Sequence, residues 1–196
     1  MINKSIFVGV ALIAGFVISG CANNRELIVS SSHATRNDVF TEIASSETES
    51  GKAIADIMFS VKSNSSRFAE MNIKHSNPPY RVHVTIDGQT TVLEAEPVLE
   101  NVSSAGINVP ESGTGWSYTF SKRIALAPGK HKLTIAIPAD NVIVEQEITL
   151  HAGENAIIVH PVYSKKLLRP YKGQNFAAGV ETLEVRVRES DGKMQR

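Results

Sequence analysis

The feature that most constrains this fold is an alternation of apolar and polar residues that recurs along most of the chain. Val82, Val84 and Ile86, for example, are separated by polar residues. Further alternating or β-prone runs lie at 57–61, 90–93, 116–126, 133–137, 142–150, 157–159 and 183–187. A period of two is typical of β-strands that bury one side. The pattern therefore predicts seven or eight short strands, and we expect no amphipathic helix beyond the first twenty residues.

Turn signals separate these runs. Asp87-Gly88 links two of them directly, and a two-residue Asp-Gly link favours a hairpin with positive φ at both turn positions. Because each strand hides only one face, two stacked sheets are the simplest way to bury them all. The sequence thus predicts an all-β fold, an antiparallel β-sandwich over residues 52–190, followed by a short tail at 191–196.

The segment 21–51 has a different composition from the rest of the chain. It is rich in Ser, Thr, Asn and Glu, as at 30–32 and 45–50. Such a composition buries little apolar surface to offset the entropy of ordering, so we expect a flexible tether. A coil of ~30 residues has a reach of ~30 Å. Within this segment, the sequence of residues 38–44 is compatible with either one helical turn or a short strand docked on the domain.

The N-terminal residues fit the pattern of a secretory signal. An apolar run at 6–18 follows Lys4, and it is shorter than the ~18 residues that a membrane-spanning helix needs. The run ends in Ile18-Ser19-Gly20-Cys21, which resembles the lipobox of bacterial lipoproteins. The resemblance implies a signal peptide over residues 1–20, cleavage between Gly20 and Cys21, and acylation of Cys21 by chains such as palmitate. The alternative is a plain signal peptide that ends in cysteine by chance.

The residue after the cysteine bears on location. In Gram-negative lipoproteins an aspartate at this position retains the protein at the inner membrane, whereas this chain has Ala22. The resemblance therefore implies a protein anchored by lipid to the outer membrane, on a face that the sequence leaves open. One acyl chain binds a bilayer only marginally, but two or more hold firmly.

Three segments resemble the PEGA-type domains of bacterial envelope proteins. They are Val-Thr-Ile-Asp-Gly at 84–88, Leu-Ala-Pro-Gly-Lys-His-Lys-Leu-Thr-Ile at 126–135 and Ile-Thr-Leu-His-Ala-Gly-Glu at 148–154. PEGA domains are small immunoglobulin- or transthyretin-like sandwiches that are generally not catalytic. The resemblance implies a structural or adhesive module and supplies no active-site residues. The chain departs from the pattern in a longer interval at 89–126 and in extra strands on both sides.

Composition and motifs argue against several classes of function. Lys plus Arg and Asp plus Glu both number 20, so no net field favours nucleic acid. The six histidines, at 33, 75, 83, 131, 151 and 160, lack the spacing of a zinc site. No Gly-x-Ser-x-Gly elbow or phosphate-binding loop is present. We therefore expect no enzyme activity, no cofactor and no metal.

The interval 96–115 is the best candidate for binding. It has an irregular composition and leads into the only tryptophan of the chain, and long loops on rigid sandwiches often carry binding. The candidate contact residues are Asn101, Ser103, Glu111, Thr114 and Trp116. The alternatives are that Trp116 packs into the core and that the interval holds further strands.

These observations predict a non-enzymatic envelope protein. Its partners would be membrane lipid, through Cys21, and another envelope component, either protein or polysaccharide. Two other functions remain open: an accessory subunit of a secretion or export assembly, and a hydrolase of envelope glycans or esters.

Overall fold

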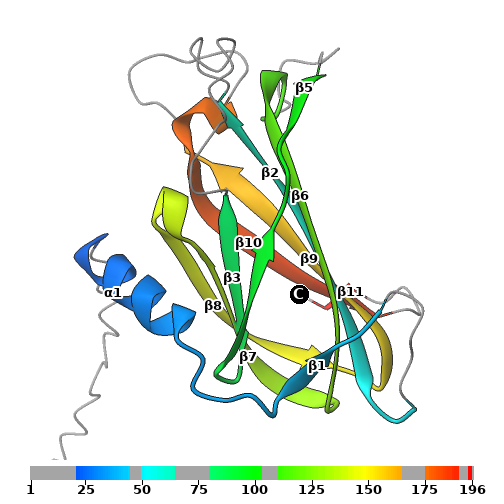
Figure 1. Cartoon of the computed structure of the whole chain (residues 1–196). Coiled ribbons are helices and arrows are strands. Elements are labelled where there is room, and N and C mark those ends of the chain that lie inside the picture. The colour runs from blue at the N-terminus through cyan, green and yellow to red at the C-terminus, as the bar shows by residue number, and fades with distance from the viewer. Residues whose placement is uncertain are drawn as a thin grey trace, which may run out of the picture.

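A computed structural model of the chain describes residues 21–44, 50–64, 80–102, 110–164, 175–189 and 194–195. These residues form two β-sheets that pack on one core, with one α-helix on the outside (Figure 1). The expected all-β fold built from two sheets is confirmed. The signal segment 1–20 and the expected cleavage position Gly20 lie outside the described residues.

The larger sheet has seven strands. They are β1 (Phe40–Glu42), β2 (Ala53–Asn64), β5 (Val98–Val102), β6 (Gly113–Leu126), β9 (Gly153–Tyr163), β10 (Val180–Glu189) and β11 (Met194–Gln195). The order is β1-β6-β2-β9-β10-β11, and β5 also pairs with β6. The pairing of β2 with β9 is parallel, so the expectation of a purely antiparallel sandwich is wrong at this position.

The smaller sheet has four strands in the order β4-β3-β7-β8. They are β3 (Arg81–Ile86), β4 (Gln89–Glu94), β7 (Gly129–Ile137) and β8 (Val142–Leu150). Asp87 and Gly88 join β3 to β4 with φ values of 47° and 90°. The hairpin with two positive φ values is therefore confirmed.

The long strand β6 connects distant parts of the chain. One edge of β6, from Gly115 to Leu126, pairs with the whole of β2. The other edge pairs with β5 near its start and with β1 near its end. Just before β5, the chain crosses from the smaller sheet to the larger one through residues 95–97 (Figure 1). Strands β1 and β5 therefore lie along the same edge of β6, at its opposite ends.

All eight predicted strands are present, and three more accompany them. The additional strands β1, β5 and β11 have three, five and two residues. Strands as short as β1 and β11 cannot display a period of two. Strand β11 pairs with the end of β10, so part of the expected C-terminal tail is a strand.

Aromatic side chains from both sheets meet in the core. Phe59 and Phe120 lie opposite each other on β2 and β6, with ring centroids 4.9 Å apart. Tyr80, next to the smaller sheet, packs on Tyr118 at 5.1 Å. Rings at these separations add to the stability gained from burying their apolar area. The alternation on β6 therefore sets which of its residues face the core.

The expected flexible tether is wrong for residues 21–37, whereas the short docked strand that was one alternative for residues 38–44 is present as β1. Helix α1 (Cys21–Ser32) lies on the outer face of the smaller sheet, against β3, β7 and β8 (Figure 1). Ile28 is 7% exposed, and the carbonyl oxygen of Ser31 accepts hydrogen bonds from the hydroxyls of Thr85 and Thr90 at 2.9 and 3.0 Å. The composition argument counted only the apolar residues of the segment itself, whereas the sheet supplies the partners that order it.

The residues after α1 are also docked. The backbone N–H groups of Thr35 and Arg36 donate to the carbonyl oxygen of Gly88, at 2.9 and 3.2 Å. The side chain of Gln89 then holds this segment through three hydrogen bonds. Its Oε1 accepts the backbone N–H groups of Val39 and Phe40, and its Nε2 donates to the Phe40 carbonyl oxygen. Strand β1 completes the attachment by pairing with β6.

Candidate functional site

The candidate binding interval is a hairpin rather than an irregular loop. Strand β5 pairs with the start of β6 in five register positions. The alternative that the interval holds further strands is therefore confirmed for residues 98–102 and 113–115. Strand β5 has five residues, all of them exposed, and its sequence Val-Leu-Glu-Asn-Val does not alternate, so it could not be identified from a period of two. Residues 103–109 lie outside the described residues.

The structure brings the predicted contact residues to one end of the larger sheet. Asn101 faces Thr114, and Leu99 faces Trp116, across the β5–β6 pair. Directly opposite residues point to the same side of a sheet, so these four share one face. Glu111 lies in the turn before β6. Ser103 lies outside the described residues.

Trp116 is half-buried and packs against the core. The alternative interpretation, in which this indole belongs to the core, therefore describes its position better than an exposed binding role. The apolar residues that remain open to solvent are instead on β5. Val98, Leu99 and Val102 are 58%, 53% and 37% exposed.

A buried lysine fixes the base of this hairpin. Lys62, on β2, is 3% exposed, and its ammonium group donates to the carbonyl oxygens of Glu111 and Gly113 at 2.8 and 2.7 Å. The same group lies 5.0 Å from the centre of the Phe176 ring. The hydroxyl of Tyr163 accepts the Lys62 backbone N–H at 2.9 Å and donates to Glu111 Oε1 at 2.8 Å. This network ties the predicted contact residue Glu111 to β2 and β9.

The environment of the network perturbs its titratable groups. Burial lowers the pKa of Lys62, although the nearby carboxylates of Glu100 and Glu111 act in the opposite direction. Burial also raises the pKa of the Tyr163 hydroxyl. Sequence reasoning missed Lys62 because it follows the buried Val61 directly and so occupies the polar phase of its strand. The network positions the hairpin, and its buried ammonium group is not open to a ligand.

The second cluster of titratable groups lies at the hairpin between β3 and β4. His131 is 8% exposed; its Nδ1 is 2.7 Å from Asp87 Oδ2 and its Nε2 is 2.9 Å from the carbonyl oxygen of Ala127. Asp87 Oδ1 also accepts the Lys132 backbone N–H at 2.8 Å. Both ring nitrogens thus face acceptors, and an imidazolium can donate to both. This histidine therefore links the turn at Asp87 to the turn at Ala127. Its Nε2 contacts a backbone carbonyl oxygen and no nucleophilic side chain.

Asp87→Asn is expected to lower the free energy of unfolding at neutral pH by about 1–2 kcal/mol, because a hydrogen bond to a charged group is lost. Burial alone would raise the pKa of Asp87, but the bonds from His131 and Lys132 lower it overall. A carboxylate with a lowered pKa stabilises the fold above its unfolded value near 4 and loses that contribution as the pH falls through the folded value. The difference between the two proteins should therefore shrink under acid. Urea unfolding at several pH values measures it.

Asparagine suits this turn as well as aspartate does, so the substitution isolates the carboxylate from the turn conformation. A His131→Asn variant serves as a partner in a double-mutant cycle. If the two substitutions were additive at neutral pH, the Asp87–His131 contact would contribute nothing.

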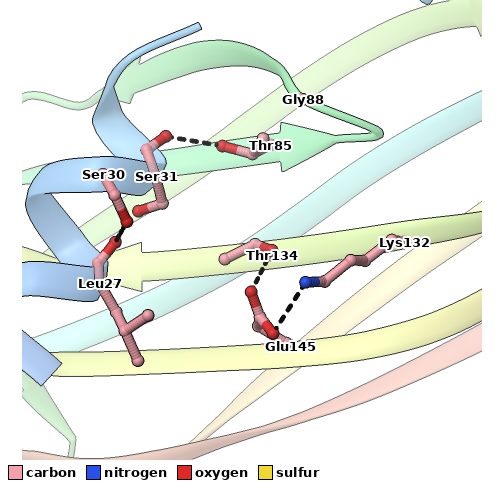
Figure 2. A pocket seen from close by; sticks show the side chains of 8 residues that line it. All are labelled: Leu27, Ser30, Ser31, Thr85, Gly88, Lys132, Thr134 and Glu145. Carbon is pink, nitrogen blue, oxygen red and sulfur yellow. Dashed lines mark hydrogen bonds and ion pairs between the residues drawn. The ribbon is translucent and has the colours of Figure 1, made fainter. Parts of the chain in front are cut away.

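A shallow cavity of ≈ 170 Å³ lies between α1 and the smaller sheet (Figure 2). It is lined by Leu27, Ser30, Ser31, Thr85, Gly88, Lys132, Thr134 and Glu145. Glu145 accepts from Thr134 and pairs with Lys132, and Thr85 bonds to α1 (Figure 2). The polar groups of the cavity are therefore satisfied by one another, and the cavity belongs to the docking of the helix.

Other predicted features remain separate from this site. Cys21 is the first residue of α1. Within the described ranges, no three His, Cys, Asp or Glu side chains come together in a way that could hold a metal ion. Helix α1 is too short and too polar to cross a membrane, and the described residues hold no other helix that could. His75 lies outside the described residues.

The chain was compared with models of protein families, with curated proteins and with solved structures, and none of them matches it.

Proposed function

We propose that this chain is a lipid-anchored envelope protein that binds a second envelope protein along strand β5. The anchor is Cys21, on the strength of the lipobox resemblance, and the location is the outer membrane. The observation that carries the binding proposal is the open edge of β5. All five of its residues are exposed, and within the described chain it pairs only with β6.

Open strand edges are reactive because their N–H and C=O groups can pair with another chain. Folded proteins usually protect such edges with lysine, proline or a bulge, and β5 has none of these within its five residues. It presents instead Val98, Leu99 and Val102. An extended segment of a partner could add to the sheet here, gaining backbone hydrogen bonds and apolar contacts together. These features favour a protein over a polysaccharide as the partner.

We also infer that the two sheets form an immunoglobulin- or transthyretin-like sandwich of the PEGA kind. Three glycines in the segments that resemble PEGA domains support this assignment. Gly88, Gly129 and Gly153 have φ values of 90°, 142° and 97°, which side chains other than glycine rarely adopt. The turn residues of the resemblance therefore occupy backbone conformations that account for them.

Photo-crosslinking in intact cells tests the binding site. A benzoylphenylalanine placed at Leu99 is expected to crosslink a single envelope protein. The matched control replaces Lys130, which is exposed on the smaller sheet and lies away from β5. The control should give no such product.

The crosslinked species identifies the class of partner. A protease-resistant, glycan-containing product at position 99 would favour a polysaccharide. Absence of any product at 99, or the same product at both positions, would contradict the β5 site.

A further inference from the structure

We propose that α1 fixes the orientation of the domain on the lipid surface, so that the face carrying α1 lies toward the bilayer and the β5 edge points away from it. The inference rests on the proposed lipid anchor at Cys21 and identifies which surface of the domain the lipid meets. It follows from the docking of the residues that connect the anchor to the sheets.

Among the described residues, no flexible linker separates Cys21 from the docked helix α1. Cys21 is the first residue of α1, and the helix is held at both ends. Near its start, Asn24 Nδ2 donates to the carbonyl oxygen of Asn141 at 3.4 Å. Near its end, Ser31 accepts from Thr85 and Thr90. A helix of this length spans ~18 Å, so residue 21, where the acyl chains would be attached, lies within that distance of the smaller sheet.

The sheet surface below α1 is built to be covered. Ala136 and Thr134 alternate with the core residues of β7 and therefore point outward, yet they are 0% and 6% exposed. Thr85, opposite Thr134 on β3, is 9% exposed. Residues on the outer face of a sheet are this inaccessible only when another element packs on them, and α1 is that element. Its undocking would expose this surface, so the docked position is favoured.

Exposed apolar side chains of α1 supply a contact for lipid. Val29 and Leu27 are 53% and 39% exposed, flank the buried Ile28 on its two sides, and lie within about 12 Å of Cys21 along the helix; Leu27 also lines the cavity beneath the helix. Two exposed apolar side chains would bind a bilayer weakly by themselves, but an acylated cysteine holds them beside it.

The charges agree with this orientation. On the face beside α1, Lys130 pairs with Glu147 and Lys132 with Glu145, at 2.8 and 3.0 Å, so these groups cancel. The β5 end instead carries the carboxylate of Glu100. Anionic headgroups would repel a carboxylate and tolerate paired charges. In Figure 1, α1 and β5 lie on opposite sides of the described structure.

Site-specific fluorescence in proteoliposomes tests the proposal. Cys21 is the only cysteine in the chain, so after its acylation an introduced cysteine is the only free thiol. The full chain is purified from membranes as Val29→Cys, Lys132→Cys or Leu99→Cys, labelled with an environment-sensitive dye, and reconstituted with lipids that carry a quencher at the headgroup. The labels at 29 and 132 should lose fluorescence, whereas the label at 99 should not.

A release variant separates orientation from simple proximity. Ile28→Ser combined with Thr85→Val removes the buried side chain and one hydrogen bond of α1, and circular dichroism checks that the sheets remain folded. The label at 132 should then recover fluorescence toward the value at 99. Equal quenching at 29, 132 and 99 in the parent protein, or no change at 132 on release, would overturn the proposal.

Mass spectrometry of the same samples distinguishes this result from a failure of the anchor. An acylated protein whose label at 29 is not quenched refutes the orientation and leaves the anchor in place. An unmodified Cys21 refutes the anchor, and the orientation with it.

Discussion

A Cys21→Ser variant is expected to lose lipid attachment completely and to accumulate as an unacylated protein, either as an uncleaved precursor or in soluble form. No other residue of the chain can form the thioether, because Cys21 is the only cysteine. The effect should be all-or-none, since two or more acyl chains bind a bilayer firmly and their loss leaves only the weak contacts of α1. Partition into detergent and incorporation of labelled palmitate measure it.

Ser30→Ala is the matched control for this experiment. It changes a residue of the same helix whose hydroxyl bonds only within the helix, to the carbonyl of Leu27. It should be acylated and should fractionate with membranes like the parent protein. A Cys21→Ser protein that still incorporated palmitate would show that the lipobox interpretation is wrong.

Phe120→Ala is expected to lower the free energy of unfolding by about 3–5 kcal/mol, the range for removing a large aromatic side chain from a core. Phe120 is 1% exposed and stacks on Phe59 at the centre of the β2–β6 pair. The loss combines the transfer free energy of the ring with the cavity that remains. Urea unfolding of the purified domain, monitored by circular dichroism, measures it.

Thr119→Ala provides the control, because Thr119 is the exposed neighbour of Phe120 on the same strand. Surface substitutions of this kind usually change stability by less than about 0.5 kcal/mol. Similar losses for both variants would mean that the alternation along β6 does not separate a buried face from an exposed one.

That alternation explains why the sheets could be predicted so fully from the sequence. Each of the eight predicted strands is long enough to show which side it buries, and the Asp87-Gly88 turn requires a conformation that few other residue pairs adopt. The order of the strands within each sheet could not be predicted from local alternation or turn residues. The parallel pairing of β2 with β9 depends on contacts between residues about a hundred positions apart, and no local pattern encodes them.

The segments that were misjudged depend on partners elsewhere in the chain. Helix α1 contains three consecutive serines and little apolar surface, so its own residues favour a coil. It is ordered because Ile28 and Ser31 meet a sheet that a composition argument does not see. Similarly, the sequence around Lys62 gives no sign that this lysine is buried. The Phe176 ring that covers its ammonium group fits only because residue 115 is a glycine, since a Cβ there would lie 2.7 Å from the ring.

The candidate contact residues that the structure describes lie together, and their role in binding stays a prediction. Asn101, Thr114 and Trp116 do come together, as their common interval suggested. The interval was taken to be a loop because its Gly, Pro and Ser residues outnumber its alternating ones. The short strand β5 was hidden among them, and its exposed residues are the ones on which the binding proposal now rests.

The pairing of β5 and β1 with opposite ends of one edge of β6 has a mechanical consequence. A partner that pulls on β5 along the strand direction would load its five paired positions with β6 at the same time, in shear, instead of opening them one after another. The load would pass along β6 to its pairs with β1, and from β1 to the segment that begins at the anchor. A protein held between a membrane and a second envelope component experiences tension of this kind. The arrangement directs that tension through hydrogen-bonded strands of one sheet, along the strand that carries Tyr118 and Phe120.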